Sequence, residues 1–200
     1  MIGVLSYGVG NPAAVVRMCE SIGIEASLVH PGQNTDCFSR IVLPGVGHFD
    51  ACVNALNQSG AWDVVNSFFH NQKGPILGIC VGAQVLGRRS EEGSLSGLSL
   101  MPMESKKMIV DSLQIPHMGW AETRWQSPLT EPLSLATRFY YSHSYVLVPD
   151  ENSLQKATFE YGQMQTGAVV CNQVVAVQFH PEKSHRHGKC FFEWFSGWAP

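Results

Sequence analysis

Short apolar runs alternate with helical patterns along the first half of the chain. Four of these runs are typical of buried strands: residues 2–6, 25–30, 40–44 and 75–80. The segments between them repeat their apolar positions at helical spacing, in residues 11–21 and again from Phe49 to Phe69. Continuous apolar strands separated by helices indicate a mostly parallel sheet that is covered on both faces. Such a sheet binds its ligands at the carboxyl ends of the strands.

The second half of the chain has a different pattern. Its strand-like runs are joined by Pro, Gly and Asn turns, which favours antiparallel pairing: residues 108–125, 138–149, 155–162 and 167–180. Residues 171–173 are typical of a hairpin turn, and residues 189–198 have a helical pattern. We find no repeat, low-complexity tract or linker, so residues 1–200 are expected to form one domain. We predict an α/β fold with a mostly parallel, helix-covered central sheet and an antiparallel extension.

The composition excludes several classes of protein. With 200 residues, of which 44% are hydrophobic, the chain can bury a substantial core and is not disordered. It has 13 Lys and Arg against 16 Asp and Glu, a net charge of −3, so we expect neither nucleic acid nor a membrane surface as a partner. No apolar run approaches the roughly 20 residues of a membrane span, and the N-terminus lacks the pattern of a signal peptide. We expect a cytoplasmic protein.

The six cysteines argue against a disulfide framework or a zinc ribbon, because no two of them form a C-x-x-C pair. Five of them are expected to be buried thiols that act as small hydrophobic side chains: Cys19, Cys37, Cys52, Cys171 and Cys190. Cys80 is the exception, because it lies in a motif that has a chemical interpretation.

Cys80 lies between two glycines at the point where a buried strand becomes a helix. The sequence Gly78-Ile79-Cys80-Val81-Gly82 has the G-x-nucleophile-x-G arrangement of a nucleophile elbow. The glycines allow a sharp turn in which backbone segments approach closely and the middle residue is strained. The side chain is then presented at the carboxyl edge of the sheet, where the positive end of the helix stabilises a thiolate. Taken alone, the motif predicts a nucleophile and a packed core cysteine equally well.

His180-Pro181-Glu182 can supply the proton shuttle that such a thiolate needs. Residues i and i+2 of an extended segment project to the same side, and Pro181 favours that geometry. His180 would accept and return the proton, while Glu182 would orient the imidazole and stabilise its charged form. The expected oxyanion donors are the backbone N–H of Val81 and the glycine-rich segment at residues 44–47, which follows a strand at the same sheet edge.

Together these motifs resemble the class I (triad) glutamine amidotransferases, and among them the glutaminase subunits of imidazole glycerol phosphate synthases. The resemblance covers essentially the whole chain and implies a flavodoxin-like α/β fold. The motifs on which it rests are SYGVGN at residues 6–11, LPGVGHFD at 43–50, GICVGAQVL at 78–86, RSEEG at 89–93, PHMGW at 116–120, FYYSHSY at 139–145 and QFHPEKS at 178–184.

The resemblance implies a role for individual residues. Cys80 is the nucleophile of a covalent glutamyl thioester, and His180 and Glu182 are its partners. The oxyanion-hole backbone positions are Gly47 and Val81. The positions that hold the substrate glutamine are Gln84, Glu92, Ser144 and Tyr145, with a carboxylate for its α-ammonium. The positions that face a partner synthase are Asn11, Tyr140 and Lys183.

The resemblance also implies the activity. We expect a glutaminase that hydrolyses L-glutamine without a cofactor and passes ammonia to a separate synthase chain, a (β/α)8 barrel cyclase, within a heterodimer. Histidine biosynthesis is the first expectation for the acceptor. The alternatives are a paralogue that supplies ammonia to a sugar-modifying enzyme of surface polysaccharide synthesis, and a catalytically silent binding subunit. Several positions near the partner-facing loops depart from the family pattern: Ser6, Pro12, Val81, Ala83, Tyr141 and Ser142.

Other readings of the motifs have less support. Residues 8–13 fit the dinucleotide-binding fingerprint, but the next strand ends in His30 rather than in an acidic residue. The H-x-E at residues 180–182 lacks the P-C-x-x-C of zinc deaminases, so no metal is expected. The remaining histidines have local roles: His185 and His187 are expected on a solvated surface, His48 in a polar loop, and His117 and His143 in local hydrogen bonds.

Overall fold

A computed structural model describes residues 1–30, 32–126, 133, 136–150 and 155–200. Five parallel strands form the centre of its main sheet, in the order β2 (Ala26–Val29), β1 (Ile2–Leu5), β3 (Arg40–Gly45), β4 (Ile76–Cys80) and β11 (Val174–Val177). The residues of β1, β4 and β11 are all buried, as expected for strands that are covered on both faces. The predicted parallel sheet is confirmed.

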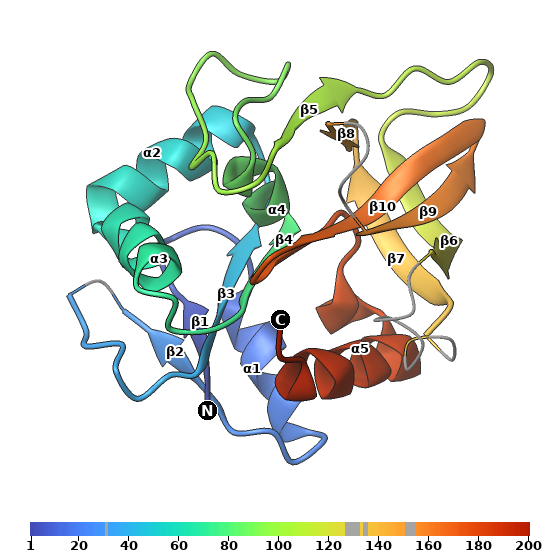
Figure 1. The fold of residues 1–200 in the computed structure, drawn as a ribbon. Helices are drawn as coiled ribbons and strands as arrows, with labels where there is room; N and C mark the ends of the chain where they lie inside the picture. The colour runs from blue at the N-terminus through green and yellow to red at the C-terminus, as the bar shows by residue number, and fades with distance from the viewer. Residues whose placement is uncertain (31, 127–132, 134–135, 151–154) are drawn as a thin grey trace.

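The sheet continues into an antiparallel extension. After β11 come β10 (Gln163–Cys171), β9 (Gln155–Tyr161), β6 (His117–Trp125) and β7 (Arg138–His143). The predicted hairpin joins β10 to β11, and Asn172 adopts a φ of 50° in its turn. A separate antiparallel pair consists of β5 (Met103–Lys107) and β8 (Tyr145–Pro149). Figure 1 shows how these strands extend the parallel sheet to one side.

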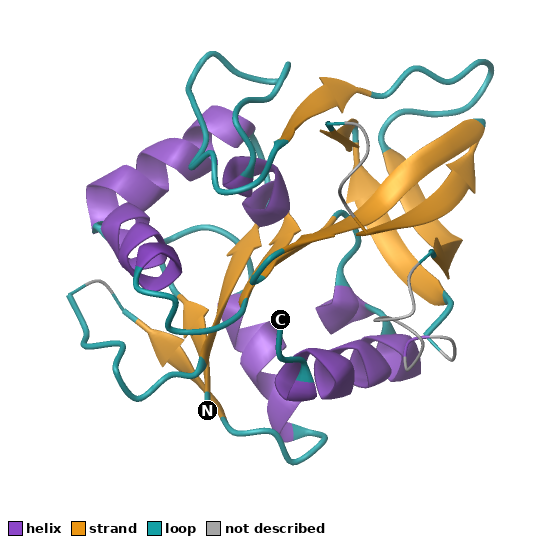
Figure 2. Ribbon diagram, in the orientation of Figure 1, coloured by secondary structure: helices purple, strands orange, loops and turns teal. Residues whose placement is uncertain are grey.

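Helices cover both faces of the parallel strands (Figure 2). One face is covered by α2 (Phe49–Ser59), α3 (Ala61–His70) and α4 (Val81–Leu86), and the other by α1 (Pro12–Glu20) and α5 (His185–Gly197). Asn11 fixes the start of α1, since its Oδ1 accepts a hydrogen bond from the N–H of Ala14 at 3.1 Å and Pro12 occupies the first turn. The aromatic residues of α5, together with Trp198 directly after it, complete the core beneath the sheet: Phe191, Phe192, Trp194, Phe195 and Trp198.

Two predictions for the second half were wrong in detail. Residues 138–149 form two strands instead of one run, because the chain leaves β7 after His143 and re-enters a different sheet as β8. Residues 108–116 form no strand, and β5 lies before them. The sequence of β5 is mostly polar, and only Met103 and Ser105 face the interior. It therefore lacks the apolar run from which a strand is predicted.

The expectation of five buried cysteines is confirmed for two of them and was wrong for the other three. Cys19 and Cys52 are fully buried, but Cys37 is exposed because it lies in the loop between β2 and β3. Cys171 and Cys190 are partly exposed at the edge of the core. Within the described ranges no helix is long and apolar enough to cross a membrane. The same part of the chain contains no group of three or more His, Cys, Asp or Glu side chains placed to hold a metal ion.

Candidate active site

Cys80 occupies a strained turn between β4 and α4. Its backbone has φ 54° and ψ −112°, outside the regions that non-glycine residues normally adopt, and α4 begins at the next residue. The flanking glycines are required by close backbone packing, as the motif predicts. A Cβ at Gly82 would stand 2.1 Å from the carbonyl oxygen of Leu43, and one at Gly78 would stand 2.6 Å from Cα of Ala83. The backbone of the elbow is therefore packed directly against the backbone of β3.

Gly82→Ala is expected to destabilise the protein by about 2 kcal/mol or more, because the added methyl collides with main-chain atoms that cannot rotate away. Urea unfolding followed by circular dichroism measures the change. The matched control is Gly197→Ala at the end of α5, where a Cβ would meet no atom within 4 Å. Equal stability of the two variants would contradict the close packing of the elbow on β3.

The structure brings His180 and Glu182 together beside Cys80. His180 Nδ1 lies 2.8 Å from Glu182 Oε1, and both side chains are almost completely buried. The segment is not extended as predicted, since residues Pro181–Lys183 form the 3-10 turn η2. The 3-10 turn folds the chain back so that the carboxylate of Glu182 meets the imidazole of His180. In an extended segment the two side chains would have met because residues i and i+2 lie on the same side. The predicted contact is present, but the predicted geometry was wrong.

The environment of His180 favours its protonated form. Burial opposes the charge, but hydrogen bonds and electrostatic attraction from Cys80 and Glu182 outweigh it and raise the pKa of His180 to about 9. A base with this pKa retains the proton that a neighbouring thiol gives up. The pair can therefore deliver a sulfur nucleophile together with a general acid.

The raised pKa of His180 predicts a pH dependence of stability. The contribution of the imidazolium is fully present below the unfolded pKa, near 6.5, and is lost as the pH rises through about 9. Between these values we expect the free energy of unfolding of wild type to fall by up to about 1.4 kcal/mol per pH unit relative to that of His180→Gln. Urea unfolding at a series of pH values measures this difference. A constant difference across the interval would contradict the raised pKa.

Main-chain hydrogen bonds fix the position of His180. Its N–H donates to the carbonyl of Tyr140 at 2.8 Å, and its own carbonyl accepts from Ser184 Oγ at 2.6 Å. Ser184 Oγ in turn accepts from the N–H of Tyr140 at 3.0 Å. Ser184 is fully buried, and its role in holding His180 was not predicted from the sequence. The base is thus attached to β7 through both of its main-chain groups.

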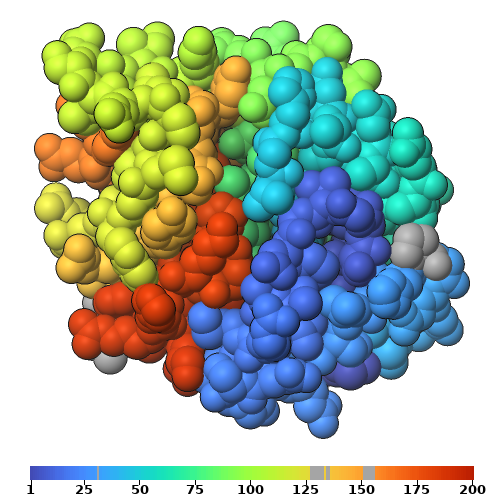
Figure 3. All heavy atoms as spheres, turned by 180° about the vertical axis from the view of Figure 1, so that it is seen from behind, coloured from blue at the N-terminus to red at the C-terminus, as the bar shows by residue number. Residues whose placement is uncertain are grey.

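A cavity of about 400 Å³ opens beside Cys80. Its lining includes most of the residues that the resemblance implied for catalysis and substrate binding: Gly47, Cys80, Val81, Gln84, Glu92, Ser144, Tyr145 and His180. Three further lining residues were not predicted to belong to a binding site: Pro116, Ser142 and His143. In Figure 3, green atoms lie at the bottom of a hollow between light-blue, orange and red segments. The volume is in the range of small-molecule sites.

Two buried glutamines connect this cavity to the thiol. Gln178 Nε2 lies 3.7 Å from Cys80 Sγ, and Gln178 Oε1 accepts a hydrogen bond from Gln84 Nε2 at 3.2 Å. Gln84 Nε2 also lies 3.5 Å from the carbonyl oxygen of Tyr145. Sequence reasoning missed Gln178, which is inaccessible to solvent. Its position two residues before His180 could have indicated a place in the site, because residues two apart at the end of a strand project to the same side.

His143 is a neutral group at the wall of the cavity. Burial, together with the charges of nearby His117 and His180, lowers the pKa of His143 to about 3 despite its hydrogen bond to the carbonyl of Tyr145 at 2.8 Å. A neutral imidazole bonded to a carbonyl through Nδ1 carries its proton there and presents Nε2 as an acceptor. The predicted local hydrogen bond of His143 is confirmed. The ring of His117 packs on Tyr161, with centroids 4.0 Å apart.

The oxyanion side of the cavity is formed by the turn after β3. Gly45 packs so closely on the elbow that a Cβ would stand 2.3 Å from the nitrogen of Gly82. Gly47 has a φ of +92°, and a Cβ there would meet no atom within 4 Å. His48 lies at the end of this turn and caps α2 by accepting from the N–H of Asp50 at 3.2 Å. The turn thus joins Gly45, which is tightly packed, to Gly47, which has free space around it.

The three residues expected to face a partner all reach the protein surface. Asn11 and Lys183 are exposed, and Lys183 Nζ stands 5.8 Å from the ring centre of half-buried Tyr140. Nearby, Trp120 stacks on His185 with centroids 5.6 Å apart. His185 is exposed as predicted. The same prediction was wrong for His187, which is buried because α5 turns that side toward the sheet.

Comparison with known proteins decides the family. The family model described as glutamine amidotransferase class-I matches residues 4–196. The chain belongs to the class I glutamine amidotransferases. This amidotransferase is 38% identical over 198 residues to imidazole glycerol phosphate synthase subunit HisH 2 of Pseudomonas aeruginosa, with 98% of each chain covered. It is 40% identical over 194 residues to subunit HisH of Leptospira borgpetersenii, covering 94% of this chain and 95% of the relative.

Solved structures show the same fold. A protein described as glutamine amidotransferase superposes on this amidotransferase with a TM-score of 0.73 at 16% identity, covering 97% of this chain and 96% of the other. PurLQS from Thermotoga maritima gives a TM-score of 0.68 at 19% identity, covering 98% and 96%. The predicted fold class is therefore confirmed by architecture and by likeness.

Proposed function

We propose that this amidotransferase is the glutaminase subunit of an imidazole glycerol phosphate synthase and works in the cytoplasm as a heterodimer with a separate (β/α)8 barrel cyclase. The observation that carries the proposal is the contact of His180 with Glu182 and Cys80 at the wall of a cavity that is large enough for an amino acid. Full-length similarity to curated synthase subunits supports the choice of acceptor.

The first step is the binding of L-glutamine. The carboxylate of Glu92 receives the α-ammonium group, and the main chain at Ser144 and Tyr145 receives the α-carboxylate. Gln84 contacts the side chain of the substrate from the floor of the cavity, where Gln178 already holds its amide. The amide carbon of the substrate then lies over Cys80.

The second step is acyl transfer. Cys80 Sγ attacks the amide carbon of glutamine with its proton already on His180, and backbone N–H groups of Gly47 and Val81 stabilise the oxyanion. The intermediate collapses by breaking the carbon–nitrogen bond, and His180 gives its proton to the departing ammonia. Water, deprotonated by His180, then attacks the thioester, and glutamate leaves as Cys80 Sγ is released beside the protonated His180. Glu182 stabilises the imidazolium in both halves of the cycle.

Ammonia leaves toward the partner. Of the three residues proposed to face the partner, Asn11, Tyr140 and Lys183, Lys183 lines the cavity and stands 5.8 Å from the ring centre of Tyr140. Exposed apolar side chains continue this surface, since Trp120 is 40% and Met118 is 64% exposed. An apolar area of this kind beside a reaction site is typical of a protein interface. The synthase would cover it and receive ammonia before it is protonated in water.

The acceptor is tested by complementation. In a host that lacks its own histidine-pathway glutaminase subunit, this chain together with its native synthase partner is expected to restore growth without histidine on low ammonium. The Cys80→Ala variant with the same partner serves as the control and should restore growth only when ammonium is abundant. Failure of wild type, with both proteins associated in the lysate, would contradict the histidine assignment.

A second candidate is a paralogue that supplies ammonia to a sugar-modifying enzyme of surface polysaccharide synthesis. It is favoured by the departures from the family pattern near the partner-facing loops, such as Ser6, Pro12 and Ser142. The P. aeruginosa relative also carries the number 2 in its name. Loss of surface polysaccharide with normal growth without histidine, after deletion of the gene in its own organism, would establish this candidate.

A catalytically silent subunit is the third candidate, and it has the least support. The chain retains a cysteine, a histidine and a glutamate in mutual contact, which a subunit without hydrolytic activity does not need. Release of ammonia from glutamine by the native complex would exclude it.

A further inference from the structure

Two carboxylates outside the catalytic contact join the start of α2 to the segment that carries Glu92. Glu92 Oε2 accepts a hydrogen bond from the N–H of Phe49, the first residue of α2, at 2.8 Å across 43 residues of sequence. Asp50 reaches in the opposite direction. Its two oxygens accept from the N–H of Ser94 at 3.1 and 3.0 Å, and Oδ1 accepts from the N–H of Leu95 at 3.1 Å. We call these five residues the reciprocal clamp.

Gly93 lies inside the reciprocal clamp, where a side chain has no room. A Cβ at this position would stand 2.0 Å from Oδ1 and 2.4 Å from Cγ of Asp50. A methyl group could be accepted only if the carboxylate left its bonds to Ser94 and Leu95. The N–H groups of Ser94 and Leu95 also hold the pKa of Asp50 below its usual range, so the carboxylate is ionised at neutral pH.

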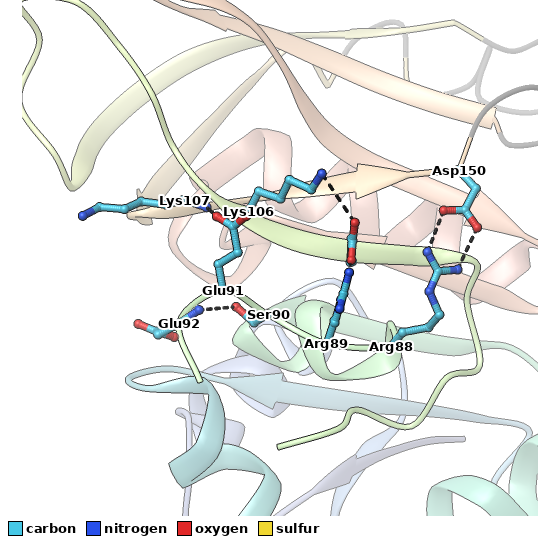
Figure 4. Close-up of polar contacts among 9 residues, drawn as sticks. Arg88, Arg89, Ser90, Glu91, Glu92, Lys106, Lys107 and Asp150 are labelled. Carbon is cyan, nitrogen blue, oxygen red and sulfur yellow. Dashed lines mark hydrogen bonds and ion pairs between the residues drawn. The ribbon is translucent and has the colours of Figure 1, made fainter. Parts of the chain in front are cut away.

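The segment that carries Glu92 is fixed to β5 on its other side. Ser105 of β5 accepts from the N–H of Glu91 and donates to the carbonyl of Arg89, both at 2.9 Å. Arg89 adds an ion pair with Glu104 of β5, and Arg88 adds one with Asp150 after β8, both at 2.7 Å. In Figure 4 these arginines extend to one side of the segment and Glu92 points away from them. The direction of Glu92 is thus set from β5 and from α2 together.

The reciprocal clamp links two parts of the cavity wall that would meet opposite ends of the substrate. Gly47 precedes Phe49 by two residues and lines the cavity on the oxyanion side, and Glu92 lines it as well. The α-ammonium group and the amide carbon of glutamine are joined by a carbon chain of fixed length. Asparagine has one methylene fewer, so it cannot reach both groups when their separation is held constant.

We propose that Asp50 is a positioning residue that holds Glu92 at a fixed distance from the oxyanion side and thereby selects glutamine over asparagine. The proposal rests on the proposed binding of the substrate ammonium by Glu92. Asp50 touches no substrate atom and acts through Ser94 and Leu95, which orient the chain around Glu92.

The first test is Asp50→Asn in complex with the native synthase partner. The amide keeps the size of the side chain but turns one acceptor oxygen into a donor that faces main-chain N–H groups. We expect the KM for glutamine to rise about tenfold and the preference in kcat/KM for glutamine over asparagine to fall by a similar factor, with kcat reduced less than about threefold. Asp63→Asn, an exposed position on α3, is the matched control and should change neither value.

The second test is a double-mutant cycle between Asp50 and Gly93. Gly93→Ala alone is expected to reproduce the increase in KM, because its methyl displaces the carboxylate. In an Asp50→Ala background, which has no carboxylate to displace, Gly93→Ala should add nothing. Additive effects of the two changes would overturn the proposed contact. Alkylation of Cys80 by iodoacetamide, which needs neither end of the substrate site, should proceed at the wild-type rate in all of these variants.

Glu92→Gln separates failure of this inference from failure of the proposed function. If Glu92→Gln raises the KM for glutamine while Asp50→Asn leaves both KM and the preference for glutamine unchanged, the positioning role is overturned and the substrate role of Glu92 stands. If Glu92→Gln leaves KM unchanged, the proposed ammonium site itself is wrong. A fall in the melting temperature of Asp50→Asn without a change in KM would assign the reciprocal clamp to stability alone and overturn the proposal.

Discussion

Replacing Cys80 by alanine is expected to lower glutamine hydrolysis by the native complex about ten-thousandfold or more, because no thioester can form without the sulfur. The fold should persist. The side chain loses one atom, and that atom lies at the wall of a cavity, where its removal disturbs little of the core packing. We expect the far-ultraviolet circular dichroism and the melting temperature to stay close to those of wild type, while an ammonia-release assay falls to background.

Cys19→Ala is the matched control for this variant. Cys19 is a fully buried thiol in α1, remote in sequence from the elbow, and its removal leaves a cavity in the core. We expect it to cost about 1 kcal/mol or more of stability and to leave glutaminase activity intact. The two cysteines should therefore show opposite effects. Activity of Cys80→Ala within about twofold of wild type would rule out Cys80 as the nucleophile.

The second large effect is activation by the partner. The isolated chain is expected to hydrolyse glutamine slowly, and a docked synthase loaded with its acceptor should accelerate hydrolysis by a hundredfold or more, since one oxyanion donor is worth roughly 3 kcal/mol. The turn after β3 has the freedom that such a switch needs. Val46 is 42% exposed, and nothing lies within 4 Å of a Cβ at Gly47. Rotation of one peptide there could complete the oxyanion hole.

Steady-state rates of ammonia release, measured with and without the synthase and its acceptor, test this activation. Lys183→Ala is expected to reduce the acceleration, because Lys183 is exposed beside Tyr140 on the proposed interface. Lys106→Ala on β5 is the control and should leave the acceleration unchanged. Full-speed hydrolysis by the purified chain alone would contradict the activation.

Much of the fold was predictable because its central strands carry a strong apolar signal. The strands β1, β4 and β11 are buried throughout, and the turns that end them contain glycine or proline. Strand β5 was not predictable, since its residues are mostly polar and its partner β8 lies about forty residues away in sequence. Pairing of this kind leaves no local pattern.

The site divides in the same way. The strained turn at Cys80 was predictable from its glycines, because only one local geometry suits that spacing. The contact of His180 with Glu182 was predicted correctly but from a wrong backbone geometry. The sequence His-Pro-Glu does not distinguish an extended segment from a 3-10 turn. Gln178 and Asp50 were missed because their partners, Gln84 and Ser94, come from distant elements. Such contacts are decided by tertiary packing.

The most direct test of the central claim follows the amide nitrogen of glutamine through the native complex. Glutamine labelled at that nitrogen is supplied together with an excess of unlabelled ammonium and the acceptor of the synthase. We predict that the imidazole product formed by wild type carries the label, because ammonia released at Cys80 passes to the partner without mixing with the solution. The Cys80→Ala complex should form only unlabelled product. Unlabelled product from wild type, or labelled product from Cys80→Ala, would contradict the claim.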